Sequence, residues 1–242
     1  MPGGTMGGAV RRGGTVLRPA GPWTPTVHRL LDHLRSHGLT WVPQPVGVDD
    51  EGRDVLTHLP GDVPQYPLPA WVWDDAVLIV AGRLLGSLHR ATSGLQLEGA
   101  LWRLPAHEPV EVVCHNDFAP YNFVFDNGRL TGVIDWDTAS PGPRVWDLAY
   151  LAYRLVPLAA PDHHDALASG ITERRRRLAL LCDAYGGELE PASVLAMVAP
   201  RLHELADLTA ARATEAPHLL GHVALYRKDA AWVAAAAADL LT

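Results

Sequence analysis

Apolar residues in the first quarter of the chain fall into short runs typical of β-strands, interrupted by one segment of helical period. The strand candidates are Ala9–Arg11, Thr15–Arg18, Val42–Val48 and Asp54–His58. A helix is predicted over Trp23–His37, where Leu30, Leu31 and Leu34 line one face. The pattern therefore predicts a small β-sheet with one helix, and the punctuation at Leu59-Pro60-Gly61 marks its end.

Helical period dominates the rest of the chain, on either side of one β-rich stretch. The predicted helices are Trp71–Thr92, a helix that begins near Asp147, Thr172–Tyr185, Pro191–Thr214 and His218–Leu241. The basic run Arg174–Arg177 fits either a phosphate site or a solvated helix face, and we expect the solvated face because charge runs usually contact water.

The β-rich stretch, residues 110–137, has the pattern of strand, loop, strand, tight turn and strand. Val110–Cys114 is the first strand, and Asn122–Phe125 and Leu130–Ile134 are predicted to form a hairpin. The hairpin turn is centred on Asn127-Gly128, because a type I′ turn needs a positive φ at both central residues. Ala139–Pro143 contains two prolines and is predicted to be a loop.

The turn also sets a register for the hairpin. Counting back from it places Asn122 opposite Val133 and Pro120 opposite Asp135. Asn122 and Asp135 therefore share one end of the hairpin, and the loop that holds Asp117 reaches the same end. One amide and two carboxylates meet there, and hard oxygen ligands of this kind suit Mg²⁺. The spacing H-x-D-x₄-N followed by a later Asp is also that of a catalytic loop for phosphoryl transfer.

Around these residues the chain resembles the aminoglycoside phosphotransferase and choline kinase group of small-molecule kinases. The resemblance rests on His115–Asn122 (HNDFAPYN), Gly132–Asp137 (GVIDWD), Asp147-Leu148-Ala149 and Leu85–His89 (LGSLH). It implies an α+β, bilobal protein-kinase-like fold with a small, abbreviated N-terminal β-lobe and a larger, mostly helical C-lobe. The expected lobes are residues 1–60 and 61–242, with a catalytic loop at 115–122, a metal-binding hairpin at 122–137 and substrate-wall helices at 172–242.

The resemblance also implies roles for the residues that match its motifs. Asp117 would accept the proton of the attacking hydroxyl, and His115, the second catalytic candidate, would position the loop. Asn122 and Asp135 would hold Mg²⁺ against the phosphates of ATP or GTP. Acids on the last helices would receive a cationic acceptor; the candidates include Glu204, Asp207, Glu215 and Asp229, and which of them face the cleft stays open.

On the nucleotide side, the base is expected to bind the backbone of a hinge near Thr57 and Leu59. Gly3–Gly8 fits a loop over the phosphates and equally fits a flexible terminus. Arg18 stands where the family carries a lysine that grips the phosphates, and the two residues are not interchangeable. The helix glutamate that pairs with this lysine in the family has no counterpart near His28.

Two hypotheses follow. The first is a phosphotransferase that moves the γ-phosphate of ATP or GTP to a hydroxyl of a small molecule, with aminoglycosides and other antibiotics among the compatible acceptors. The second is a catalytically weak or inactive kinase-like binding or immunity protein that sequesters a small ligand. Arg18 and the missing glutamate favour the second hypothesis, whereas the intact set Asp117, Asn122 and Asp135 favours the first.

Composition narrows the setting. The 242 residues are 48% hydrophobic and 19% charged, as in globular proteins, and a net charge of −7 argues against non-specific nucleic-acid binding and suits a cationic ligand. Cys114 and Cys182 lie far apart and are expected to be free thiols in a reducing compartment. We expect no signal peptide. We expect no membrane span either, because the apolar segment Ala230–Leu241 is short and carries Asp239. The cytoplasm is therefore the expected location. Monomer and homodimer both remain open.

Overall fold

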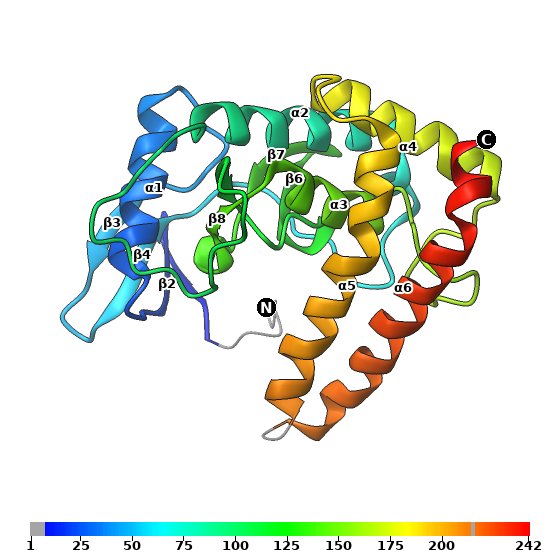
Figure 1. Cartoon of the computed structure of the whole chain (residues 1–242). Coiled ribbons are helices and arrows are strands. Elements are labelled where there is room, and N and C mark those ends of the chain that lie inside the picture. The colour runs from blue at the N-terminus through cyan, green and yellow to red at the C-terminus, as the bar shows by residue number, and fades with distance from the viewer. Residues whose placement is uncertain (1–7, 214–215) are drawn as a thin grey trace. The chain divides into compact units, whose positions relative to one another are not determined.

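The computed structural model describes residues 8–213 and 216–242, which form two compact units (Figure 1). The first unit contains the described residues up to Val72 together with Leu85–Arg144, and the second contains Trp73–Leu84 and Val145–Thr242. The chain passes from one unit to the other within helix α2 (Asp75–Ala91). A small N-terminal sheet and a larger helical part make the fold α+β, as predicted. The expected lobe boundary after residue 60 stays a prediction.

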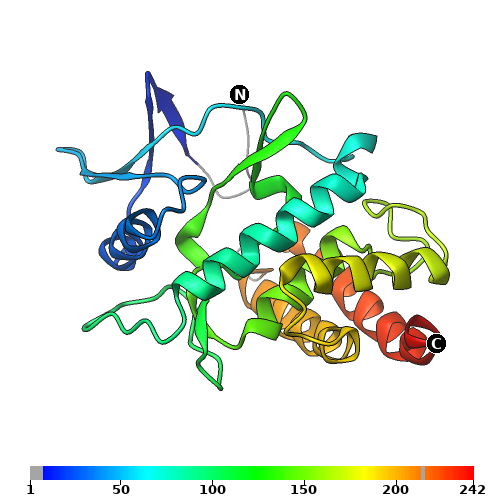
Figure 2. The same cartoon turned by 90° about the horizontal axis from the view of Figure 1, so that it is seen from above.

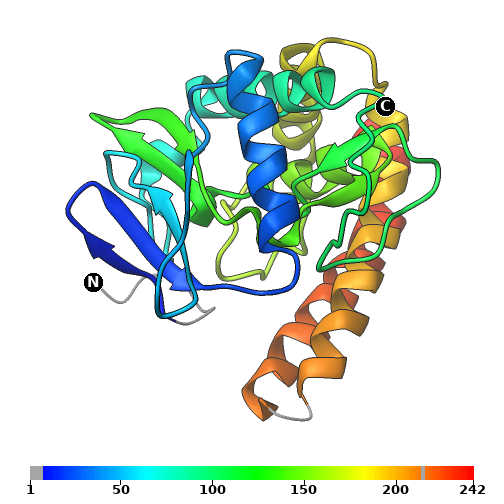
Figure 3. The same cartoon turned by 90° about the vertical axis from the view of Figure 1, so that its left-hand side faces the viewer.

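The N-terminal sheet has four antiparallel strands in the order β1-β2-β4-β3. They are β1 (Val10–Arg12), β2 (Thr15–Pro19), β3 (Pro45–Val48) and β4 (Arg53–Thr57). Figure 3 shows helix α1 (Thr24–Ser36) alongside this sheet, and its predicted stripe of Leu30, Leu31 and Leu34 is fully buried. Every predicted element of this region is present, with ends displaced by at most three residues.

Two further strand pairs belong to the first unit. Strands β6 (Phe123–Asp126) and β7 (Arg129–Val133) form the predicted hairpin, and β5 (Val112–Cys114) is the predicted strand before it. The loop predicted at 139–143 is wrong, because β8 (Ser140–Gly142) pairs antiparallel with β5. Pro141 is tolerated at the centre of β8 because its backbone polar groups face away from β5: its carbonyl accepts the His107 N–H at 2.9 Å, so the pairing with β5 needs no donor from it.

The hairpin register differs from the predicted one by one residue. Close to the turn the pairing is as predicted, but Phe123 lies opposite Val133 because Thr131 is the extra residue of a β-bulge. The predicted pairing of Asn122 with Val133 is therefore wrong, as is the pair predicted beyond it. Instead, the Ile134 N–H donates to Asn122 O at 2.9 Å, so this end of the hairpin still adjoins the 115–122 loop.

The second unit is helical, and the helices predicted for it are present. They are α3 (Arg144–Leu155), α4 (Ile171–Tyr185), α5 (Pro191–Ala213) and α6 (Leu220–Leu241), with a short 3₁₀ turn at η4 (Pro217–Leu219). The 3₁₀ turn η1 (Ala70–Trp73) lies where the chain first leaves the first unit. Figures 1 and 2 both show α5 and α6 side by side. None of the helices in the described part of the chain combines the length and apolar character that a transmembrane span requires.

The basic run on α4 is not the solvated face that we predicted. Arg174 and Arg177 are both 2% exposed, whereas Arg176 between them contacts water and nearby acids. Arg174 Nη1 donates to Ala159 O at 2.6 Å, and Arg177 Nη2 donates to Leu155 O at 2.8 Å. Leu155 is the last residue of α3, where a carbonyl lacks an intrahelical donor, and the buried Arg177 guanidinium supplies one.

One of the four acids considered for a substrate wall is a buried structural residue. Asp229 has no exposed surface; it accepts hydrogen bonds from Tyr153 Oη at 2.8 Å and from the Ala160 N–H at 2.9 Å. Such a carboxylate connects α6 to α3 and to the segment after it, and it is not available to a ligand. Glu215 lies outside the described residues.

Candidate functional site

The loop at 115–122 is tied to the segment that follows β7 by side-chain hydrogen bonds. Asn116 adopts a φ of 65°, in the left-handed region that asparagine tolerates. Its Nδ2 donates to Thr138 O and to Ser140 Oγ, both at 2.8 Å. Thr138 Oγ1 in turn donates to His115 O at 2.9 Å. The two segments that carry the candidate site residues therefore hold one another in place.

His115 has no exposed surface, and both of its ring nitrogens are engaged. Nε2 donates to Ile134 O at 3.1 Å, and Nδ1 accepts the Asp117 N–H at 3.2 Å. A single tautomer, with the proton on Nε2, satisfies both bonds. This geometry suits the positioning role expected of His115.

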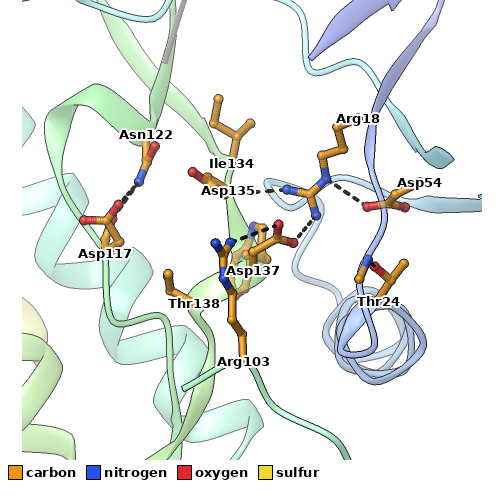
Figure 4. Close-up of polar contacts among 12 residues, drawn as sticks. Arg18, Thr24, Asp54, Arg103, Asp117, Asn122, Ile134, Asp135, Asp137 and Thr138 are labelled. Carbon is orange, nitrogen blue, oxygen red and sulfur yellow. Dashed lines mark hydrogen bonds and ion pairs between the residues drawn. The ribbon is translucent and has the colours of Figure 1, made fainter. Parts of the chain in front are cut away.

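The Asp117 carboxylate accepts hydrogen bonds from two neighbours in the same loop, which ends in the 3₁₀ turn η2 (Pro120–Asn122). Tyr121 Oη donates to Asp117 Oδ1, and Asn122 Nδ2 donates to Asp117 Oδ2 and to Asp117 O, both at 2.9 Å (Figure 4). Because the amide nitrogen of Asn122 is fully used, Oδ1 is the atom left to bind a cation. Sequence reasoning missed Tyr121, whose only signal is its place directly before Asn122.

Asp135 follows β7 and has a φ of 62°, directly before the 3₁₀ turn η3 (Trp136–Thr138). Burial and the negative charge of Asp117 raise the pKa of the Asp135 carboxyl, and the charge of Arg18 opposes the shift only in part. Two carboxylates held near one another favour a bound cation. Asp135 and Asn122 Oδ1 offer oxygen ligands, so they fit Mg²⁺, which completes its shell with water and phosphate oxygens.

Arg18 lies on β2 and faces three carboxylates (Figure 4). Its Nε donates to Asp54 Oδ2 at 2.8 Å and its Nη2 to Asp137 Oδ1 at 2.7 Å, while Nη1 lies 3.6 Å from Asp135 Oδ1. Burial alone would lower the pKa of Arg18, but the charges of these acids outweigh it and raise the pKa above its ordinary value. Arg18 and the candidate metal ligand Asp135 are therefore in direct electrostatic contact.

Asp54 and His28 support Arg18, and sequence reasoning did not connect them to the site. Asp54 is the direct partner of Arg18 in the pairing of β2 with β4. His28 Nε2, on α1, donates to Asp54 Oδ1 at 2.6 Å. Burial alone would raise the pKa of Asp54, but the His28 hydrogen bond and the charge of Arg18 outweigh it and lower the pKa. Only the register of the two strands identifies Asp54, and no local sequence pattern reveals that register.

Asp137, two residues after Asp135, is ion-paired. Besides Arg18 it faces Arg103, whose Nη1 lies 3.8 Å from Asp137 Oδ2. The Arg103 guanidinium also lies over the Trp23 ring, 4.7 Å from its centroid. Arg103 comes from the segment between α2 and β5 and carries no motif, so no sequence signal pointed to it.

The two hinge residues expected to contact the base differ in their backbone bonding. The Thr57 N–H donates to Gln44 O and the His58 N–H to Gly14 O, both at 2.9 Å. The Leu59 N–H has no hydrogen-bond partner within residues 8–213 and 216–242. Leu59 therefore offers the donor that a nucleotide base could use, whereas the Thr57 donor is occupied.

The hinge continues into a contact with β6. Asp62 and Phe125 exchange two backbone hydrogen bonds of 2.8 Å. Gly61, directly before Asp62, has a φ of 133°. A Cβ at this position would lie 2.4 Å from Phe125 O, so only glycine fits. The expected phosphate loop Gly3–Gly8 lies outside the described residues except for Gly8 itself.

Comparison with known proteins identifies a family and a relative of this chain. A family model described as the phosphotransferase enzyme family (APH) matches residues 65–181. The chain is 33% identical over 194 residues to a trifolitoxin immunity protein from Rhizobium leguminosarum bv. trifolii, covering 77% of this chain and 73% of that protein.

Two solved structures illustrate the fold. An amicoumacin kinase, solved with AMP-PNP and Ca²⁺, is 14% identical with a TM-score of 0.65, covering 89% of this chain and 81% of its own. A choline/ethanolamine kinase family protein from Mesorhizobium loti is 18% identical with a TM-score of 0.61, covering 97% of this chain and 85% of its own. The chain therefore belongs to the phosphotransferase enzyme family of aminoglycoside phosphotransferase and choline kinase-like proteins.

Proposed function

We propose that this protein is a Mg²⁺-dependent kinase that transfers the γ-phosphate of ATP or GTP to a hydroxyl group of a small molecule. The observation that carries the proposal is the convergence of Asp117, Asn122 and Asp135 at one end of the β6–β7 hairpin, with Arg18 facing Asp135. All four residues belong to the first compact unit. Phosphoryl transfer depends mainly on positioning and on neutralising charge, and this set supplies both.

Asp117 is the residue that would handle the acceptor. Its Oδ2 is held by Asn122, and its Oδ1 accepts the phenol of Tyr121. An acceptor hydroxyl that replaces the phenol would donate to the same Oδ1. As its oxygen attacks the γ-phosphorus and the bond to the bridging oxygen breaks, the hydroxyl proton would pass to Asp117.

The nucleotide would be held on the other side of this point. Bound Mg²⁺ would neutralise charge on the phosphate oxygens, with Asn122 Oδ1 and the Asp135 carboxylate as its protein ligands. Arg18 would contact a phosphate, and the Leu59 N–H would bind the base. In this proposal residues 1–60 act as the nucleotide-covering lobe and the helices in 172–242 as the acceptor wall of a cytoplasmic enzyme.

The acceptor we propose is an antibiotic or a related small molecule with a free hydroxyl group. The name of the amicoumacin kinase supports an acceptor of this kind. The net charge of −7 suits a cationic acceptor such as an aminoglycoside.

A second candidate function is ligand sequestration without catalysis. It is favoured by one observation: Arg18 is engaged by three carboxylates, so a nucleotide must displace two of them to reach its Nη atoms. The immunity relative is compatible with such a role.

Thermal unfolding with ATP or GTP, with and without Mg²⁺, tests the proposal. A ligand at a hundred times its Kd adds about 2.7 kcal/mol, which raises Tm by about 5–11 °C in a chain of this length. We expect this shift in the wild type and in the control Asp126→Asn, an exposed acid of the same hairpin, and its loss in Asp135→Asn. Phosphate transfer to hydroxylated antibiotics should then disappear in Asp117→Ala. If millimolar nucleotide shifts no Tm, sequestration replaces the kinase hypothesis.

A further inference from the structure

Asp54 is a buried carboxylate with a partner on each oxygen. Its side chain is 1% exposed, Oδ2 accepts Arg18 Nε at 2.8 Å, and Oδ1 accepts His28 Nε2 at 2.6 Å. Burying an ionised carboxylate is costly unless it is both paired and hydrogen-bonded. The side chains of Arg18, Asp54 and His28 therefore form one hydrogen-bonded network that connects β2, β4 and α1.

The bond to Asp54 occupies one edge of the Arg18 guanidinium and leaves the other edge to face the site. The Nε edge is bound to Asp54, whereas Nη2 and Nη1 face Asp137 and Asp135 at 2.7 and 3.6 Å. The guanidinium is a rigid planar fork, so fixing Nε also fixes the direction of both Nη atoms. A lysine has a single nitrogen and could not bind a strand carboxylate on one side while presenting a planar pair of donors on the other.

We propose that Asp54 and His28 together replace the helix glutamate expected of a kinase of this family, and that they hold Arg18 ready for the nucleotide phosphates. This inference rests on the proposed function. On nucleotide binding, phosphate oxygens take the Nη edge from Asp137 and Asp135, while the bond from Nε to Asp54 persists. Asp54 and His28 are positioning residues, because they act through Arg18. In this protein the supporting carboxylate lies on a strand instead of on the helix. An arginine at position 18 can bind that carboxylate through Nε and still present its Nη atoms to phosphate.

The test measures nucleotide affinity and the state of Arg18 separately. A fluorescent ATP analogue is titrated with Mg²⁺ into the folded wild type, Asp54→Asn and the control Asp50→Asn. Asp50 is an exposed acid in the same unit whose side chain makes no hydrogen bond or ion pair with residues 8–213 or 216–242. We expect Asp54→Asn to weaken binding at least about tenfold, equivalent to about 1.4 kcal/mol, and Asp50→Asn to leave it unchanged. His28→Gln should stay within about threefold, since its amide still donates to a carboxylate, whereas His28→Leu should weaken binding as Asp54→Asn does.

The outcomes separate this inference from the proposed function. If the wild type binds no nucleotide, both the inference and the proposed function are wrong. Binding by the wild type with equal affinity in Asp54→Asn and Asp50→Asn overturns the inference alone. If Asp54→Asn does not fold, the ¹⁵Nε–H NMR signal of Arg18 in the wild type decides: we expect Mg²⁺ with ATP to shift the Nη signals and leave the Nε signal in place. A displaced Nε signal would refute the persistent bond to Asp54.

Discussion

Adding one methyl group at Gly61 tests how closely the chain after Leu59 packs against β6. Its φ is 133°, and a Cβ built there would lie 2.4 Å from Phe125 O and 2.8 Å from Val124 Cγ1. The carbonyl belongs to the backbone of β6, which the two hydrogen bonds between Asp62 and Phe125 hold in place. The clash cannot be relieved by rotating a flexible side chain.

The magnitude has two parts. Holding a non-glycine residue at such a φ costs about 1–3 kcal/mol, and forcing extra volume into a packed position costs about 1–3 kcal/mol more. We therefore expect Gly61→Ala to lower the free energy of unfolding by about 4 kcal/mol, which corresponds to a Tm loss of about 8–16 °C. Gly128→Ala is the matched control, because Gly128 also has a positive φ of 75° but no atom within 4 Å of its Cβ position.

Urea unfolding followed by tryptophan fluorescence gives both free energies. The clash predicts a larger loss for Gly61→Ala than for Gly128→Ala, by about 1–3 kcal/mol. Equal losses would refute the reasoning, because they would leave only the backbone strain that both substitutions share. Nucleotide affinity adds a second readout: it should fall in Gly61→Ala alone, since Gly61 lies two residues after Leu59 in the hinge.

Three other predictions concern buried groups. Asp229→Ala should destabilise the protein by about 3–5 kcal/mol in urea unfolding, because Tyr153 Oη loses its acceptor, whereas Asp207→Ala at an exposed position should change little. Burial lowers the pKa of His163, although the charge of Asp229 opposes the shift. The folded state thus favours the neutral ring, so the contribution of His163 to the free energy of unfolding is complete above about pH 6.5 and falls as the pH drops. His163→Gln should make the free energy of unfolding less dependent on pH between about pH 5 and 7. Burial raises the pKa of Cys182 to about 12, so a thiol reagent at about pH 8 should modify it only at the rate of unfolding, and fast labelling of the folded protein would contradict this.

The loop at 115–122 and the hairpin were predictable because their signals are local. The turn at Asn127-Gly128 fixes two strands by sequence alone, and the spacing from His115 to Asn122 places amide and carboxylate together. The bulge at Thr131 was not predictable, since an ordinary threonine can sit in a regular strand or in a bulge. The error displaced the register by one residue without separating the two ends of the hairpin.

The surroundings of Arg18 depended on contacts between distant segments. The sequence analysis looked for an acid on the helix near His28, whereas the acid that holds Arg18 is Asp54, on a strand whose pairing with β2 no local pattern reveals. Burial of Arg174 was missed for a similar reason: its partner, the Ala159 carbonyl, follows a different helix. Long-range register and tertiary acceptors decided both cases.

The passage of the chain through α2 has a consequence for inheritance and for protein splitting. The unit that carries Arg18 and Asp54 also carries Asp117 and Asp135, yet residues 73–84, which belong to the other unit, interrupt it in sequence. No single crossover between genes can therefore transplant the whole cluster without the intervening segment. A chain cut after residue 60 leaves its arginine on one fragment and its catalytic loop on the other, so any activity recovered on mixing the halves would report their reassembly.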